Sequence, residues 1–263
     1  MLKKFTLNNL LKRPKILVSS LILISNTFLC ANSDIEKLKN AYPNFIKDYS
    51  NNYIIWNDDE KMIFDDLISN KSFEEKLNNP SLKDQLSIKY IKTIENKDYI
   101  PSLNEDAGRI RYEPFFKKMY GKNEREVNKN LVKIPWMPKY TKRNITVTKI
   151  NDIDKKLINI SSELENLPKH LRDFVLNPEG AYNWRKIANS NNISVHSFGI
   201  ALDINVKNSN YWLWDKGTNK KYKYKNQIPL EIVEIFEKHG FIWGGRWYHY
   251  DTMHFEYRPE LLD

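Results

Sequence analysis

One short apolar segment in the C-terminal half of the chain carries two polar residues. The segment SVHSFGIALDINV, residues 194–206, has the alternating apolar pattern that predicts a β-strand. His196 and Asp203 are seven positions apart, and side chains at an odd separation lie on opposite faces of a continuous strand. Both reach one site only if the chain turns between them, and Gly199 tolerates the backbone angles of such a turn. Ala201 is small enough to leave room beside the two polar groups.

A second segment supplies another histidine and another acid that a metal site could use. In DTMHFEY, which starts at Asp251, an acid precedes His254 by three positions at the entry to a predicted strand. Two histidines and one aspartate form a three-ligand zinc set with an open fourth position, as in catalytic sites. Bound zinc lowers the pKa of water and polarises a carbonyl, and a nearby carboxylate can transfer the proton. The first segment alone leaves a second interpretation open, a hydrogen bond between His196 and Asp203 in a buried core.

Together the two segments resemble the zinc D-alanyl-D-alanine carboxypeptidase family. The pattern Ser-x-His-x-x-Gly-x-Ala-x-Asp at 194–203, followed by Asp-x-x-His-Phe-Glu at 251–256, is similar to the paired motifs of that family. The family includes the vancomycin-resistance D,D-carboxypeptidases and dipeptidases and the L-alanyl-D-glutamate endolysins, and it shares its fold with hedgehog signalling domains. The resemblance covers about residues 140–263 and leaves residues 34–139 unexplained.

The resemblance implies a role for each matching position. It implies zinc ligands at His196, Asp203 and His254, and a general base at Asp251. It also implies an arginine, on a strand before the first motif, that binds substrate and stabilises the oxyanion. Arg185 in AYNWRKI is the candidate, because a guanidinium offers paired donors to a carbonyl oxygen or a carboxylate. The alternative for this arginine is an exposed salt bridge.

Further candidates lie close to the motifs. Ser194 can hydrogen-bond beside the metal site, and Trp247 can form a cleft wall or pack in the core. His249 is a candidate for substrate contact. Glu256 lies two positions after His254, hence on the same strand face, where it can steady the site. The predicted substrate-binding residues are Arg185, Ser194 and Trp247.

The order of the predicted elements indicates the fold class. Strands and helices follow one another from about residue 140 without a regular strand–helix repeat. This favours an α+β domain over residues 140–263, with a mostly antiparallel central sheet flanked by helices. The predicted strands are NITVTKI, AYNWRKI, FIWGGRW and MHFEY, and the main predicted helices are INDIDKKLINISSELENLP and IPLEIVEIFEKHG.

Residues 32–139 are predicted to form a largely helical N-terminal region of unknown role. Its candidate helices are DIEKLKNAYPNFIKDY, DEKMIFDDLI and SFEEKLNN. Arg109 and Arg111 could bind substrate carboxylates if this region covers the cleft.

Residues 1–31 have the features of a secretory signal peptide. Basic KRPK precedes the apolar run ILVSSLILIS, which is shorter than the roughly 20 residues of a membrane span. Cleavage is expected near Ala31, which predicts export to the periplasm or cell envelope of a bacterium and no stable membrane span afterwards. An uncleaved anchor and lipidation of Cys30, the one cysteine of the chain, are the alternatives.

The charge argues against nucleic-acid binding. The formal net charge is +9, but five basic residues and no acid lie within 1–31, and the rest has 37 basic and 33 acidic residues, a net charge of +4. No concentrated basic stripe remains to neutralise phosphates.

The sequence therefore predicts an exported zinc peptidase that hydrolyses peptidoglycan stem peptides, with D-alanyl-D-alanine carboxypeptidase as the expected activity. Three enzyme alternatives are an L-Ala–D-Glu endopeptidase, a cross-link endopeptidase and an L,D-carboxypeptidase. A non-catalytic zinc-binding or envelope-binding module is the alternative of another class. The oligomeric state is not predicted.

Overall fold

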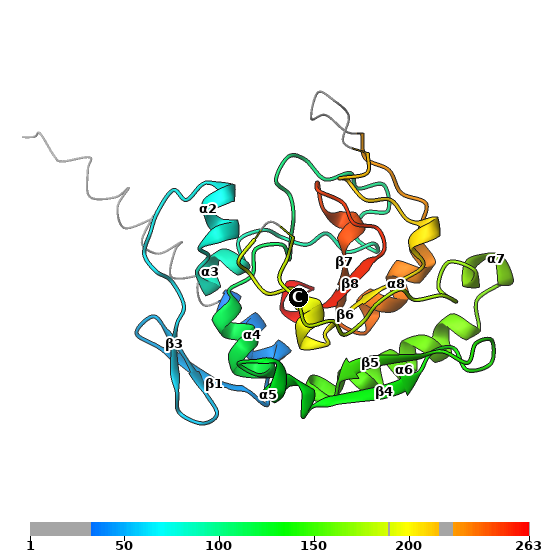
Figure 1. Ribbon diagram of the computed structural model, residues 1–263. Coiled ribbons are helices and arrows are strands. Elements are labelled where there is room, and N and C mark those ends of the chain that lie inside the picture. Colours follow the sequence, from blue (N-terminus) through cyan, green and yellow to red (C-terminus); the bar gives the residue numbers. More distant parts are fainter. Residues whose placement is uncertain (1–32, 189, 216–222, 263) are drawn as a thin grey trace, which may run out of the picture.

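The computed structural model describes residues 33–188, 190–215 and 223–262. The predicted signal peptide and Cys30 lie outside these residues. The protein is α+β, as predicted, with short antiparallel sheets and helices around one main core (Figure 1). Among the described helices, none combines the length and the apolar character that crossing a membrane requires.

The central sheet has three short antiparallel strands. Its order is β6 (Ala201–Asp203), β8 (His254–Tyr257) and β7 (Phe241–Trp243). In the register of β6 and β8, Asp203 lies opposite His254 and Ala201 lies opposite Glu256. Two segments about fifty residues apart in the sequence therefore present side chains on one sheet face.

One amphipathic helix packs on this sheet, and a second packs on the first. Helix α8 (Leu230–Lys238) begins after Pro229 and buries its apolar face. Its Phe236 stacks on Phe255 of β8 with ring centroids 3.9 Å apart. Helix α6 (Ile153–Glu165) packs against α8 and buries Leu157, Ile160 and Leu164. The short α7 (Lys169–Arg172) follows α6.

A β-hairpin joins the two predicted segments of the chain. Strands β4 (Leu131–Pro135) and β5 (Asn144–Thr148) pair antiparallel across the predicted boundary at 139/140 and pack against α6, along the lower edge of Figure 1. One hydrophobic core contains buried residues from Ile35 to Tyr257. Residues of both predicted segments therefore contribute to the same core.

The N-terminal region contains a sheet that its sequence does not predict. Strands β1 (Ile46–Ser50), β2 (Tyr53–Trp56) and β3 (Lys61–Ile63) form a three-stranded antiparallel meander. The predicted helix DEKMIFDDLI is wrong, because Met62 pairs with Ile54 of β2 and its segment is extended. Pairing with a neighbouring strand outweighs the helical spacing of the apolar residues.

The helices of this region are short. The first predicted helix, residues 34–49, is confirmed only in its first half: residues 33–41 are helical, whereas residues 46–49 belong to strand β1. Helix α2 (Phe73–Asn78) begins as predicted after Ser72, which forms a capping box with Glu75. The other helices here are α3 (Leu82–Gln85), α4 (Glu113–Tyr120) and α5 (Glu124–Asn128). Single 3₁₀ turns occur at η1 (Ile150–Asp152), η2 (Val195–Phe198), η3 (Val206–Asn208), η4 (Gly244–Arg246) and η5 (Pro259–Leu261).

Candidate metal centre and cleft

The segment 194–206 is a 3₁₀ turn followed by a strand, rather than one continuous strand. Ser194 precedes the turn η2, and its hydroxyl accepts a hydrogen bond from the backbone N–H of His196 at 3.4 Å. Gly199 ends the turn with φ +69°, in the left-handed region. A Cβ at this glycine would lie 2.9 Å from the backbone nitrogen of Thr148. The turn predicted from the odd separation is therefore present, and it requires glycine.

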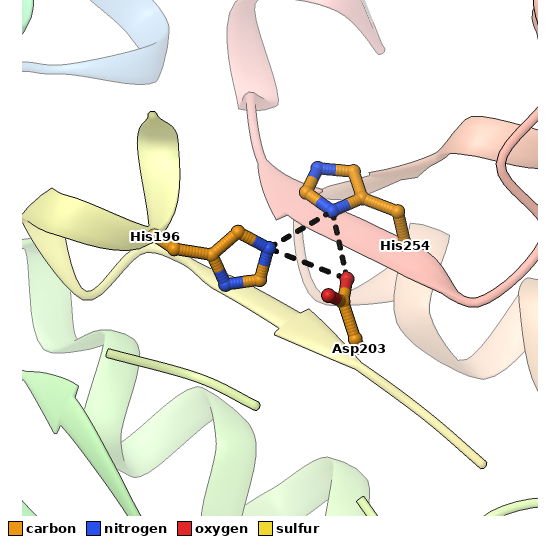
Figure 2. Close-up of side chains that lie close together, drawn as sticks. All are labelled: His196, Asp203 and His254. Atoms are coloured by element: carbon orange, nitrogen blue, oxygen red, sulfur yellow. Dashed lines mark hydrogen bonds and ion pairs between the residues drawn. The ribbon is translucent and has the colours of Figure 1, made fainter. Parts of the chain in front are cut away.

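His196, Asp203 and His254 come together at one point (Figure 2). The Oδ1 atom of Asp203 lies 2.9 Å from Nδ1 of His254 and 3.3 Å from Nε2 of His196. The two ring nitrogens are 3.3 Å apart. All three donor atoms thus lie within reach of one ion.

These separations fit a tetrahedral metal site. Zinc holds nitrogen and oxygen ligands at about 2.0–2.2 Å, so tetrahedral ligand atoms lie about 3.3–3.6 Å from each other. Two of the three separations lie at the lower end of this range, and the third is shorter. A carboxylate and two imidazoles are also the donor types that zinc prefers in catalytic sites.

The second nitrogen of each imidazole has its own partner. Nδ1 of His196 lies 2.7 Å from the carbonyl oxygen of Ala181, and Nε2 of His254 lies 2.9 Å from Oε2 of Glu256. Each ring donates an N–H to that acceptor, which leaves Nε2 of His196 and Nδ1 of His254 as the metal-facing nitrogens. Such partners fix ring orientation and raise ligand basicity.

Glu256 is buried and held by arginines. Arg258 donates to Oε1 at 2.9 Å, and Arg111 donates to Oε2, the oxygen that also faces His254. Burial raises the pKa of Glu256, but Arg111 and the hydrogen bond with His254 outweigh burial and hold that pKa well below its usual range. Glu256 is therefore an anion beside the site. Its place on the face of His254 was predicted, whereas the two arginines as its partners were not.

The electrostatics of the cluster favour a cation. Burial lowers the pKa of His254, but hydrogen bonds with the carboxylates of Asp203 and Glu256 reverse this and raise it to about 10. The cluster thus stabilises a positive charge between two carboxylates. A metal ion supplies that charge when its ligands lose their protons.

One cleft contains all the predicted site residues. It has a volume of about 470 Å³, a size typical of ligand sites. The residues of the sequence prediction that line it are Arg185, Ser194, His196, Asp203, Trp247, Asp251 and His254.

Asp251 lies beside the metal cluster, three positions before His254. Its backbone N–H donates to Gly244 at 3.0 Å and its carbonyl accepts from the N–H of His254 at 3.2 Å. Oδ1 is shielded from solvent and has no hydrogen-bond partner among the described residues. Burial raises the pKa of Asp251 to about 6, against the opposing influence of His254. A carboxylate with a pKa near neutrality can both accept and return a proton.

Arg185 lines the cleft from an irregular segment. The predicted strand AYNWRKI is wrong, since it pairs with other described residues through no more than an isolated bridge between Lys186 and Ile193. Ser197 fixes this extended chain instead, because its hydroxyl accepts from the N–H of Arg185 at 2.8 Å. The Arg185 residue is exposed, and no ion pair joins its guanidinium to an acid of the described residues.

The N-terminal region forms one wall of the cleft, which meets the condition under which Arg109 and Arg111 could bind substrate. Both arginines line it, together with Leu77 and Asn78 at the end of α2. Four more side chains line the cleft: Tyr211, Trp212, Leu213 and the substrate-contact candidate His249. The rest of the lining comes from the segment before and within η2: Ile187, Ala188, Ser190, Asn192 and Val195. No local motif marks Tyr211, Trp212 and Leu213, because they reach the cleft only through the fold.

Trp247 and His249 contact the N-terminal region directly. The indole N–H of Trp247 donates to the carbonyl of Ala107, and its ring lies 5.5 Å from that of His254. Nδ1 of His249 lies 2.6 Å from the buried carboxylate of Asp106. Both cleft residues are therefore positioned by residues outside the predicted catalytic domain.

A sequence model of the D-alanyl-D-alanine carboxypeptidase family matches residues 188–257. The matched segment contains the three clustered donors and Asp251, but neither Arg185 nor the N-terminal wall of the cleft. The match supports a relationship with this peptidase family and a peptidase activity on peptidoglycan. Comparison with curated proteins and with solved structures gives no match.

Proposed function

We propose that this protein is a zinc-dependent peptidase that hydrolyses a peptide bond in peptidoglycan stem peptides. The observation that carries the proposal is the convergence of Nε2 of His196, Oδ1 of Asp203 and Nδ1 of His254 on the wall of a cleft. The family match over the same segment supports it. D-alanyl-D-alanine carboxypeptidase is the proposed specificity, because that is the activity by which the matching family is described.

The three clustered residues would hold the zinc ion. Zinc supplies Lewis-acid chemistry, since it lowers the pKa of a coordinated water and polarises the peptide carbonyl. Asp251 is the proposed general base, which takes the proton of the attacking water on its unpartnered Oδ1. The same carboxylic acid then returns the proton to the departing amine.

Arg185 is the proposed partner of the developing oxyanion or of the substrate's terminal carboxylate. Its guanidinium is exposed in the same cleft as the metal cluster and is not engaged by an acid among the described residues. Ser194 and Trp247 complete the proposed substrate-binding set. Ser194 acts mainly through the turn that carries His196, and Trp247 forms the wall beside His254.

We also propose that the protein acts outside the cytoplasm, in the periplasm or cell envelope. The support is the basic and apolar sequence of residues 1–31. Peptidoglycan stem peptides, the proposed substrates, are found there.

Digestion of defined muropeptides tests the proposal. The zinc-loaded full chain is incubated with pentapeptide and tetrapeptide stems, and the products are weighed by mass spectrometry. Loss of one terminal alanine from the pentapeptide supports the D,D-carboxypeptidase. Loss of alanine from the tetrapeptide indicates an L,D-carboxypeptidase, and an internal cut indicates an endopeptidase. If no stem peptide is cleaved with zinc present, the proposed peptidase activity is contradicted and a binding module is favoured.

A further inference from the structure

A chain of contacts runs from the N-terminal region to the metal cluster. Arg111 donates to Oε2 of Glu256, and the same oxygen lies 2.9 Å from Nε2 of His254. Glu256 has no exposed surface, and the Arg111 side chain is only 16% exposed. Arg111 lies outside the segment that matches the peptidase family.

The two oxygens of Glu256 have different partners. Oε1 accepts from Arg258, which is itself fully buried and also donates to Glu260 and to the carbonyl of Gly108. Arg258 is thus tied to the core whether or not Arg111 is present. Oε2 depends on Arg111 for its remaining charge-assisted hydrogen bond, and this oxygen is the one that orients His254.

A second contact ties Arg111 to the same histidine. The Arg111 guanidinium lies 5.9 Å from the ring centroid of Trp247, and that ring lies 5.5 Å from the ring of His254. Arg111 therefore interacts with both Glu256 and Trp247, and both of these lie next to the His254 imidazole. Its charge is already engaged by Glu256, which disfavours a carboxylate of the substrate at the same guanidinium.

We propose that Arg111 is a positioning residue for zinc: it holds Glu256 so that His254 keeps Nδ1 directed at the ion. This inference rests on the proposed function, because it presupposes zinc at the cluster. It gives residues 32–139 a role, because Arg111 from this region holds the carboxylate that orients a zinc ligand. Without Arg111, Glu256 keeps Arg258 at Oε1 but loses the arginine at Oε2, so the oxygen that accepts from the His254 ring is held less firmly.

Zinc affinity of the purified full chain tests this role by competition with a chromophoric chelator. Arg111→Gln should bind zinc about 10–100-fold more weakly than the wild type. Arg111→Lys keeps the positive charge beside Glu256 and should recover most of the affinity. Arg111→Met replaces the glutamine variant if that one does not fold, since its apolar side chain can still pack against Trp247. The same loss of zinc affinity is expected for it.

Lys118→Gln is the matched control. Lys118 lies in the same region, pairs with Glu60 at 2.6 Å and lies 5.9 Å from the ring centroid of Trp56, but it does not line the cleft. Its substitution removes an ion-paired cation beside a tryptophan and should leave zinc affinity unchanged. The visible spectrum of the Co²⁺-loaded protein gives a second readout, which should change for Arg111→Gln and stay as in the wild type for the control.

The outcomes separate this inference from the proposed function. Wild-type zinc affinity in Arg111→Gln and Arg111→Met, with an unchanged Co²⁺ spectrum, would overturn the positioning role and leave the zinc site standing. A raised KM at unchanged zinc affinity would also overturn it and assign Arg111 to substrate binding. A wild-type protein that binds no zinc would contradict the proposed function, and the positioning role with it.

Discussion

Asp203 lies opposite His254 in the antiparallel pair of β6 and β8, and its Oδ1 is 2.9 Å from Nδ1 of that histidine. Two of the three candidate ligands are thus fixed by sheet register, whereas His196 is placed by the turn before β6. A register shift of one residue would turn Asp203 to the other face of the sheet. The candidate site is therefore as rigid as the sheet and the Gly199 turn that carry it.

Gly199→Ala tests the turn. The φ of +69° is unfavourable for alanine, and its Cβ would lie 2.9 Å from the backbone nitrogen of Thr148. We expect a loss of at least about 1–2 kcal/mol in the free energy of unfolding, and weaker zinc binding because His196 is displaced. Urea denaturation and a zinc titration measure the two effects.

Gly180→Ala is the control for this prediction. A Cβ at Gly180 meets no atom of the described residues within 4 Å, and its φ is not in the left-handed region. The free energy of unfolding of Gly180→Ala should stay close to that of the wild type. Equal stability of the two alanine variants would show that the Gly199 turn is not needed for the fold.

Asp251→Ala tests the general base. Asp251 lines the cleft but lies outside the cluster of three donors, so its removal should leave zinc bound. The rate of stem-peptide hydrolysis should fall by about 10²–10⁴-fold, the usual contribution of a general acid–base group. Zinc content by atomic absorption, measured on the sample used for kinetics, separates lost chemistry from lost metal. Near-wild-type hydrolysis would exclude Asp251 as the base.

The odd separation of His196 and Asp203 predicted the turn at Gly199, and the resemblance carried by the paired motifs implied that both converge with His254. Neither could predict the acceptor at Ala181 or the arginines around Glu256, because hydrogen bonds across the fold leave no local pattern. The α+β class was also predictable, from the order of elements. The strand β3 was not, because its extended shape depends on pairing with β2 rather than on its own apolar spacing.

Arg185→Gln tests the proposed oxyanion partner. Removing a guanidinium that stabilises developing charge should lower kcat/KM by about 10²–10³-fold while zinc affinity stays unchanged. Lys186→Gln is the neighbouring control, since Lys186 is exposed and does not line the cleft. Equal kinetics of the two variants would assign Arg185 to the surface rather than to the reaction.

Zinc reconstitution tests the central claim most directly. Metal-free protein is titrated with zinc while the hydrolysis of stem peptides is followed, with His196→Ala in parallel. We expect no hydrolysis without metal, a linear rise that ends at one zinc per chain, and no activity of His196→Ala at that stoichiometry. Full hydrolysis in the presence of a strong chelator, or wild-type activity of His196→Ala, would contradict the account.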